Sequence, residues 1–439
     1  MGERYPSSLT FPLEPCQGGK DLFVTLGHPE LVAAISSEII RMGPIPFVRF
    51  MELALYHPQY GYYMRPADGA DHERIGWSGD FYTSSDVHPI LGRAMAAQAR
   101  QMDELLGRPT PFTIVEMGAG KGLLARDCLR AIHAEQDDFA SRVRYVLIER
   151  SPAMQELQRQ HLAPWRHKPG LVTWIEELDA LAPQSVTGLF FSNELVDAFP
   201  VHRIQVVAGQ VKELFVDYRD GRFEECLKPL STPALDQYIQ RLEPTWPDGY
   251  RTEMNLQALE WMDQVAQRID RGFVVTIDYG HTAQDLYGPD RKDGTFLCYY
   301  QQLTGDMPYV RIGQQDMTAH VDFTSLATIG AAAGLSVTGF TNQMSFLMGL
   351  GVEDMIGQLD PESQEFGAAI HLLKPDGMGR TFKILVQHRG VECPDLAGLK
   401  FKPFFGSALA TNQARGERHE AMGQSLPSSR SPLTPSLQA

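Results

Sequence analysis

The chain has 439 residues, a formal net charge of −15 and a composition typical of globular proteins, with 43% hydrophobic and 21% charged residues. This length allows two or three domains around a large buried core. The acidic balance and the lack of a dense Lys/Arg cluster argue against a nucleic-acid partner, because a protein that follows a phosphate backbone needs a basic stripe. The sequence contains no run of 18 or more apolar residues, so we expect no membrane insertion.

The five cysteines are widely spaced, and none stands in a CxxC pair. A disulfide framework and a structural zinc site are therefore not expected, and we predict no metal ligands. The first 20 residues lack the apolar core of a signal peptide and the Arg-rich pattern of a transit peptide. We therefore expect a cytoplasmic location, and the sequence leaves the oligomeric state open.

An N-terminal helical segment is expected over residues 1–108. Apolar residues recur there at helical spacing, and Gly43 provides a stop for the first helix. The predicted helices cover residues 28–42, 47–56 and 89–106. The tyrosine-rich stretch 56–63 lies between them. We interpret this stretch as packing rather than binding, because aromatic side chains bury large areas.

Strands and helices alternate over residues 109–390, which predicts an α/β fold with a mostly parallel sheet and helices on both faces. The predicted strands cover residues 112–117, 143–148, 172–175, 189–191, 273–277, 335–340 and 382–387. Insertions are expected at about 201–254, with a hairpin turning at Gly209, and at about 343–380. A tail follows over 391–439, and its last part is rich in Ser and Pro and predicted to be disordered.

A glycine-rich loop, Glu116-Met-Gly118-Ala-Gly120-Lys-Gly122, follows the first predicted strand. Glycines at such a turn let the backbone approach a nucleotide-like ligand without Cβ clashes. Residue 123 is leucine where a dinucleotide fingerprint requires its third glycine, which disfavours NAD. Glu116 would repel a pyrophosphate, but it can oppose the amino group and sulfonium of S-adenosylmethionine. We therefore predict S-adenosylmethionine as the ligand of this loop.

Two further acids follow the next predicted strands. Glu149 ends the second strand, where its two oxygens can accept hydrogen bonds from both ribose hydroxyls. The alternative for Glu149 is a solvated charge at a helix N-terminus. Glu177 follows the third strand and is a candidate for binding the adenine amino group, with Asp179 as a competitor and a plain surface role equally open.

A polar cluster over residues 192–200 follows the fourth predicted strand and contains Asn193, Glu194 and Asp197. In open parallel sheets the ligand crevice lies at the carboxyl ends of the strands. The cluster is therefore well placed to handle a methyl acceptor, although Asn193 and Asp197 could instead cap the following helix.

Together these motifs resemble the MidA family, the bacterial relatives of the mitochondrial complex I assembly factor that methylates arginine. The matching segments extend in order over about residues 30–390. They are Gly43-Pro-Ile-Pro-Phe with Phe50-Met51, Tyr56-His-Pro-Gln-Tyr-Gly-Tyr-Tyr63, Gly79-Asp80-Phe81-x-Thr83, Val115-Glu-Met-Gly-Ala-Gly-Lys-Gly122, Asn193-Glu194-x-x-Asp197-Ala198-x-Pro200-Val201, Asp278-Tyr279-Gly280-His281, Thr318-Ala319-His320-Val321-Asp322-Phe323 and Met378-Gly379-x-x-Phe382-Lys383. In one departure, Ala119 stands where the family loop commonly has proline.

The resemblance implies a class I, Rossmann-like methyltransferase fold, with a seven-stranded sheet whose last strand is antiparallel to the others. It also implies S-adenosylmethionine as the methyl donor and a protein acceptor, with an arginine of a respiratory complex I subunit as the model. Gly79, Asp80 and Phe81 are expected to fold over the cofactor as part of its pocket. The resemblance assigns cofactor binding to Glu116, Gly118, Gly120, Gly122 and Glu149.

If the acceptor is arginine, its protonated guanidinium must be aimed at the methyl group. Paired carboxylates match the fork of guanidinium donors. We predict Glu194 and Asp197 for this catalytic role, with Asn193 beside them and Asp80 as a further candidate. These carboxylates would also accept the proton that the attacking nitrogen loses.

Tyr279 and His320 are predicted to bind the acceptor, because Tyr279 follows the strand-five acid Asp278 and could line the pocket, and His320 lies in a motif of its own. A lone histidine is more often structural, however, and this alternative holds for His281 and His320. Two other functions stay open. The same fold hosts methyltransferases for small molecules or nucleic acids, and a non-catalytic assembly factor could keep a cofactor pocket.

Overall fold

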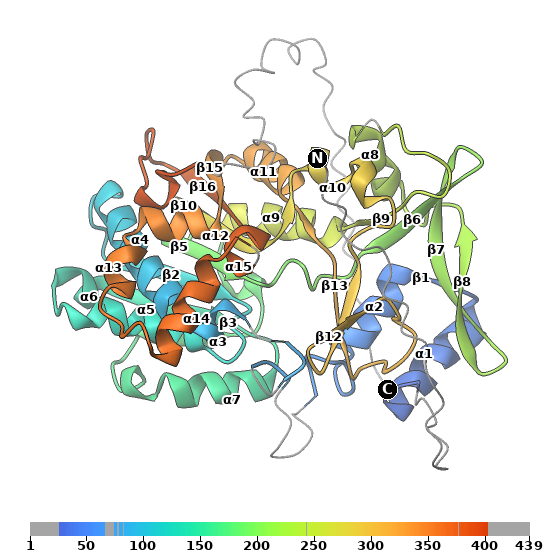
Figure 1. The fold of residues 1–439 in the computed structure, drawn as a ribbon, viewed down its shortest axis with the longest axis horizontal. Helices are drawn as coiled ribbons and strands as arrows, with labels where there is room; N and C mark the ends of the chain where they lie inside the picture. Colours follow the sequence, from blue (N-terminus) through green and yellow to red (C-terminus); the bar gives the residue numbers. More distant parts are fainter. Residues whose placement is uncertain are drawn as a thin grey trace, which may run out of the picture.

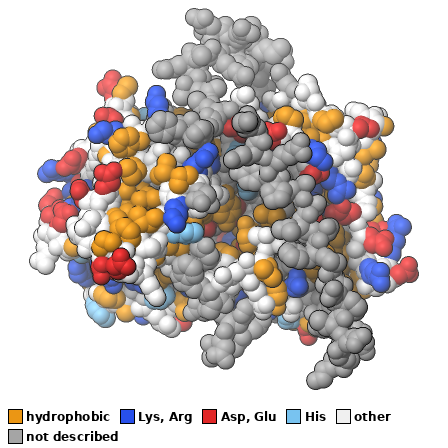
Figure 2. Space-filling view, in the orientation of Figure 1, with side chains coloured by type: hydrophobic (Ala, Val, Ile, Leu, Met, Phe, Trp, Pro, Cys, Tyr) orange, Lys and Arg blue, Asp and Glu red, His pale blue; other side chains and the backbone are white. Residues whose placement is uncertain are grey.

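The computed structural model describes residues 26–65, 74–76, 79–81, 83–242, 244–375 and 377–402. The predicted disorder near the C-terminal end and Cys16 lie outside these residues. Within the described ranges, no helix combines the length and the apolar character that a membrane crossing needs. Lys and Arg side chains are scattered over the face in Figure 2 rather than gathered in a stripe.

A twisted central sheet organises the larger part of the molecule (Figure 1). Its strands follow the order β15-β16-β10-β5-β2-β3-β4, and all pairs from β10 to β4 are parallel. Strand β16 is antiparallel to both of its neighbours. The strands are β2 (Phe112–Met117), β3 (Val143–Ile148), β4 (Val172–Ile175), β5 (Val186–Asn193), β10 (Ile269–His281), β15 (Ser336–Asn342) and β16 (Phe382–Arg389).

All seven predicted strands are therefore present, and the mostly parallel α/β fold is confirmed. One addition was not predicted. The two-residue strand β14 (Val321–Asp322) pairs in parallel with the end of β10 and makes the sheet eight-stranded. A pair this short carries too little periodicity to be recognised from the sequence.

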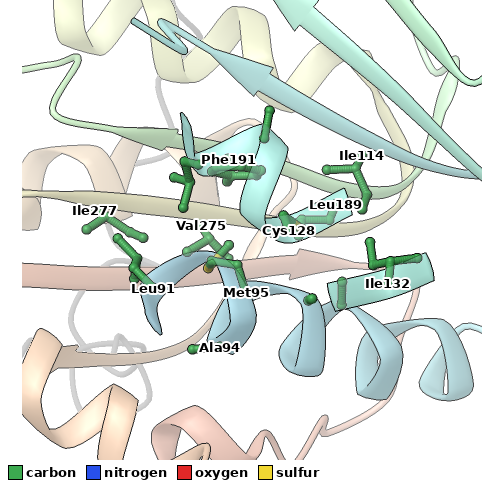
Figure 3. Close-up of a cluster of buried hydrophobic side chains, with 14 of the residues drawn as sticks. Leu91, Ala94, Met95, Ile114, Cys128, Ile132, Leu189, Phe191, Val275 and Ile277 are labelled. Atoms are coloured by element: carbon green, nitrogen blue, oxygen red, sulfur yellow. The ribbon is translucent and has the colours of Figure 1, made fainter. Parts of the chain in front are cut away.

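Helices cover both faces of the sheet because residues along each strand alternate between two apolar layers. On one face, Leu189 and Phe191 of β5 pack with α4 (Ile90–Leu105) and α5 (Leu123–Ala134). Figure 3 shows this layer, where Leu91 and Met95 lie against strand residues. On the other face, Phe190 packs with α9 (Leu256–Arg268) and α11 (Phe323–Ala332). Helices α6 (Asp138–Arg142) and α7 (Pro152–His161) contact α5.

The first insertion and the first two helices of the N-terminal segment form one unit beside the main sheet, on the right of Figure 1, whereas the third predicted helix is α4 on the main sheet. The predicted helices appear as α1 (Pro29–Met42) and α2 (Phe47–Tyr56), and the predicted hairpin appears as β6 (His202–Val207) and β7 (Gln210–Arg219). Val201, Val216 and Phe223 share a core with both helices. The remaining elements are β1 (Ile45–Pro46), β8 (Arg222–Lys228), β9 (Arg251–Met254) and α8 (Pro233–Leu242).

The second insertion is helical, and hydrophobic side chains gather over it on the face shown in Figure 2. Its helices are α12 (Gln343–Gly349), α13 (Val352–Ile356), α14 (Gln364–Leu373) and α15 (Met378–Thr381). A further small sheet, in the order β12-β11-β13, was not predicted. Its strands are β11 (Leu297–Tyr300), β12 (Leu303–Gly305) and β13 (Asp316–Thr318). Two further short helices are α3 (Ser84–Val87) and α10 (Ala283–Leu286).

Candidate active site

A cavity of about 380 Å³ opens at the carboxyl ends of β2, β3, β5 and β10. This is the edge at which open parallel sheets bind ligands, because loops leave the strands there in different directions. Most of the predicted site residues line it: Phe81, Glu116, Gly118, Gly120, Glu149, Glu177, Asn193, Glu194, Asp197 and Tyr279. The structure thus brings together side chains that are far apart in the sequence.

The glycine loop uses the conformational freedom of its glycines. Gly118, Gly120 and Gly122 have φ values of +74°, +51° and +80°, which residues with a Cβ rarely adopt. A Cβ on Gly118 would also lie 2.7 Å from the Cδ1 atom of Leu195. Gly122 does not line the cavity; it precedes α5, and a Cβ there would lie 3.0 Å from Cγ of Gln158. The first two glycines therefore shape the cavity, and Gly122 serves packing.

Glu116 and Glu149 are buried acids at the ends of β2 and β3. Glu116 accepts a hydrogen bond from the Tyr145 hydroxyl, and burial raises the pKa of Glu116 to about 7. Glu149 accepts hydrogen bonds from the backbone N–H of Ser151 (2.8 Å) and from Nε2 of Gln158 (3.2 Å), and burial raises its pKa to about 7.

Gln158 supports the cavity wall through hydrogen bonds, and the sequence offers no signal for this role. Its Nε2 atom also donates to the carbonyl of Gly120 at 2.8 Å, and its Oε1 atom accepts from Trp174 at 3.0 Å. Gln158 therefore fixes the glycine loop relative to Glu149. The cavity wall formed by the glycine loop, with Glu116 and Glu149 beside it, fits the charge and hydroxyl pattern of S-adenosylmethionine. Glu177 lies at the exposed rim, 3.5 Å from Nη2 of Arg150.

The turn after β5 holds the predicted catalytic carboxylates. Glu194 has φ +54°, an uncommon conformation for a residue with a side chain and one that concentrates at functional sites. Its Oε1 atom accepts hydrogen bonds from the N–H of Ser84, at the start of α3, and from Nδ2 of Asn193, both at 3.1 Å. Burial raises the pKa of Glu194 to about 8. Asn193 therefore orients Glu194. The alternative that Asn193 and Asp197 cap a following helix is wrong, because β5 is followed by a turn and then by β6.

Asp197 is buried in the same turn, and Asp278, near the end of β10, is buried beside it. The Oδ1 atom of Asp197 is buried and accepts no hydrogen bond from the described residues. Burial raises the pKa of Asp197 well above its usual value, and the nearby carboxylates of Asp278 and Asp316 raise it further. Asp278 accepts hydrogen bonds from the N–H groups of Leu195 (3.2 Å), Val196 (2.9 Å) and Asp197 (3.3 Å), so it holds the turn in shape.

The tyrosine-rich stretch contributes to the cavity, which corrects its interpretation as packing alone. Tyr56 and Tyr63 line the cavity, and their rings stack with centroids 5.5 Å apart. The Tyr63 hydroxyl donates a 2.6 Å hydrogen bond to Asp316, another cavity-lining acid that was not predicted. Asp316 stands two residues before the Thr318-Ala-His motif, so proximity to that motif is the one signal in the sequence that could have indicated it.

Asp80 and Gly79 do not line the cavity, although the neighbouring Phe81 does. The Asp80 carboxylate is buried and accepts hydrogen bonds from the Tyr62 hydroxyl and the N–H of Gln301, both at 2.8 Å. Asp80 therefore connects the Gly-Asp-Phe segment to the turn between β11 and β12. This placement contradicts its proposed catalytic role, because the carboxylate is engaged away from the cavity.

His320 also lies outside the cavity and borders a small pocket that Val321 and Asp322 of β14 line as well. Its ring centroid is 6.1 Å from that of Tyr279 and 5.3 Å from that of His281. Burial lowers the pKa of His320 to about 4, so the ring is neutral near pH 7. The structure therefore favours the structural alternative over acceptor binding for His320.

Residues 90–341 match the family model described as "Putative S-adenosyl-L-methionine-dependent methyltransferase". The chain belongs to this family. A curated Drosophila melanogaster relative of the methyltransferase, named protein arginine methyltransferase NDUFAF7 homolog, mitochondrial, is 29% identical over 83% of the chain and 86% of its own length. Human NDUFAF7, named a mitochondrial protein arginine methyltransferase, is 25% identical over 80% and 82%. The relationship to the MidA family is thereby confirmed.

Solved structures agree with the fold and the cofactor. A Burkholderia thailandensis protein bound to S-adenosyl-homocysteine is 28% identical to the methyltransferase, with a TM-score of 0.76 over 85% of this chain and 95% of that one. S-adenosylmethionine is therefore the methyl donor, as predicted. The expected cytoplasmic location is wrong, because the curated relatives that cover most of the chain are named mitochondrial. The absence of an Arg-rich pattern in the first 20 residues was too weak a criterion for location.

Proposed function

We propose that the methyltransferase modifies an arginine side chain of a protein. The observation that carries this proposal is the pair of carboxylates on the turn after β5, of which Glu194 is half-buried and Asp197 is buried. Glu194 Oε2 and Asp197 Oδ1 accept no hydrogen bond from the described residues, although both side chains line the cavity. Each of the two neighbouring acids therefore keeps one oxygen that can accept a hydrogen bond. Such a pair matches the forked arrangement of N–H donors on a guanidinium. The names of the curated relatives support the same acceptor.

Positioning supplies most of the catalysis in this proposal. S-adenosylmethionine, when bound, supplies the methyl group, which passes to a nitrogen by in-line displacement. Glu194 and Asp197 orient the guanidinium, because an aligned attack contributes much of the rate in such reactions. Asn193 and the Ser84 N–H hold Glu194 in place. A Glu194 carboxylate then accepts the proton that the methylated nitrogen releases.

Among protein acceptors, a respiratory complex I subunit is the first to test, because the MidA resemblance implies it. The purified chain is incubated with methyl-labelled S-adenosylmethionine and a lysate of its host, and the labelled residue is located by mass spectrometry. We expect label on arginine in wild type and its loss in Glu194→Gln. Label on a metabolite or a nucleic acid would contradict the proposal. Calorimetric binding of S-adenosylmethionine without any transfer would instead favour a non-catalytic assembly factor.

A further inference from the structure

The acceptor end of the cavity has a second acidic wall, which comes from outside the central sheet. Asp316 is the first residue of β13, a strand of the small β12-β11-β13 sheet. Its side chain is 2% exposed and lines the same cavity as Glu194 and Asp197. It is also near enough to Asp197 to raise the pKa of that residue. Carboxylates from two separate elements thus face one cavity.

Hydrogen bonds engage only one oxygen of Asp316. Its Oδ1 atom accepts from the Tyr63 hydroxyl (2.6 Å) and from the N–H of Met317 (2.8 Å). The Oδ2 atom receives no hydrogen bond from the residues that the structure describes. The carboxylate is therefore fixed by two donors and keeps one oxygen for a ligand, as do Glu194 and Asp197.

A pair of tyrosines connects the two acidic walls. Tyr63 stacks on Tyr56 with an interplanar angle of 25°, and the Tyr56 hydroxyl donates to the carbonyl of Ala198 at 3.0 Å. Ala198 directly follows Asp197. The position of Asp316 is therefore linked, through packed aromatic rings, to the turn that carries the other acids. Such preorganisation reduces the cost of ordering side chains when a ligand binds.

The three acids at the acceptor end of the cavity lack a cationic partner within the described part of the chain, whereas Asp86, which also lines the cavity, pairs with Lys121. Glu194, Asp197 and Asp316 form no ion pair with a Lys or Arg side chain there. Burial of several carboxylates without a counter-charge is costly, because desolvation and mutual repulsion both oppose ionisation. Burial accordingly raises the pKa of Asp316 to about 6. A positively charged ligand would relieve both effects.

We propose that Asp316, oriented by Tyr63, is a third acceptor-recognition carboxylate and makes the methyltransferase select a cationic acceptor over a neutral group of the same shape. The inference rests on the proposed function for the place of the acceptor, but it requires only that the acceptor carries a positive charge. Because a hydrogen bond to a charged group contributes about 1.5–3 kcal/mol, one such contact discriminates by about tenfold or more.

Two small probes test this selectivity directly. Nα-acetyl-L-arginine amide is cationic, and Nα-acetyl-L-citrulline amide is its neutral counterpart of nearly equal shape. Binding of each is measured by NMR titration of the full chain saturated with S-adenosyl-homocysteine. We expect wild type to prefer the arginine probe by about tenfold or more. Equal affinities, or no binding of the arginine probe, would overturn the proposal.

Variants assign the selectivity to Asp316. Asp316→Asn should reduce the preference to about threefold or less, and Tyr63→Phe should reduce it partly because Asp316 loses a donor. Glu260→Gln is the matched control, because it removes an exposed carboxylate that also borders the cavity and should keep the wild-type preference. Calorimetric binding of S-adenosyl-homocysteine shows whether each variant is folded. If Asp316→Asn fails to fold, the preference for the arginine probe is measured in Tyr63→Phe and Asp316→Glu instead, and these two variants decide whether Asp316 carries the selectivity.

The outcomes separate this inference from the proposed function. A wild type that prefers the arginine probe, yet labels a lysine or an amine in the lysate, would refute arginine as the acceptor and leave the role of Asp316 standing. Arginine labelling with an unchanged preference in Asp316→Asn would refute the role of Asp316 and leave the proposed function standing.

Discussion

Glu194 combines a strained backbone, a half-buried carboxylate and an open oxygen toward the cavity. Backbone strain of this kind persists where the surrounding structure holds it, and here the N–H of Ser84 and the amide of Asn193 do so. We expect Glu194→Gln to lower turnover by about 100-fold or more, because the amide cannot accept the released proton. S-adenosylmethionine affinity, measured by calorimetry, should stay within a few fold. Near-normal turnover would remove Glu194 from the catalytic role.

The pH dependence offers a second measurement of the same residue. The value of kcat/KM for the acceptor reports ionisations of the free enzyme. Because the pKa of Glu194 is raised to about 8, kcat/KM should rise with pH up to that region. The apparent value belongs to the acidic cluster as a whole, since Asp278 is raised to about 8 as well. A profile that is flat between pH 6 and 8 in wild type would contradict this assignment.

At the scale of elements, the turn between β5 and β6 depends on one side chain from β10. Asp278 accepts three consecutive backbone N–H groups of this turn and that of Tyr279. In Asp278→Ala these donors lose their acceptor, and each buried unpaired group costs about 1–3 kcal/mol. We expect a free energy of unfolding lower by about 3 kcal/mol or more, measured by chemical denaturation, together with a large loss of turnover.

Asp278→Asn is the matched variant for this turn. Its carbonyl can still accept the three N–H groups, while its amide faces the N–H of Tyr279. It should therefore lose less stability than Asp278→Ala. Equal stability of both variants and wild type would show that the turn holds its shape without Asp278.

The elements that could be predicted are those whose signals are local. Strands such as β2 and β3 are short, mostly apolar segments, and their bounds follow from composition and flanking turns. Glu116, Glu149 and the turn after β5 could be assigned because Glu116 lies at the end of such a strand and the other two directly follow one. In contrast, β11 and β13 are short, and they pair only with each other and with β12. Asp316 depends on this pairing, so no local pattern indicates its place in the cavity.

The same limit of local sequence signals explains why the role of Asp80 was not predicted correctly. Its motif, Gly79-Asp80-Phe81, marks a segment at the cavity, and Phe81 does line it. The sequence does not show which side chains of a segment face inward, and the Asp80 carboxylate instead reaches Tyr62 and Gln301. A motif thus located the segment, but hydrogen bonds to residues elsewhere in the chain decide the role of its acid.

At the scale of the whole molecule, the buried acids make stability depend on pH near neutrality. Burial raises the pKa of Glu116 and Glu149 to about 7, and that of Glu194 and Asp278 to about 8. Each folded-state pKa lies above the unfolded value, so the folded state binds more protons and stability falls as pH rises toward the folded pKa. Histidines whose pKa is lowered in the folded state act in the opposite direction near pH 6.5, because their unfolded imidazoles, with a pKa of about 6.5, still bind protons there. Above about pH 7.5 these histidines are almost fully neutral in both states and no longer oppose the acids.

We therefore expect the melting temperature of the acceptor-free chain to fall by at least about 2 °C between pH 7.5 and pH 8.5, because each fully titrating group contributes about 1.4 kcal/mol per pH unit. Scanning calorimetry at constant ionic strength measures this slope. Glu194→Gln has one titrating acid fewer and should give a shallower slope, whereas the exposed Glu260→Gln should keep the slope of wild type. A melting temperature that is constant or rises over this interval would mean that these acids are already ionised in the folded chain, and the cavity would then need a counter-charge from the protein itself.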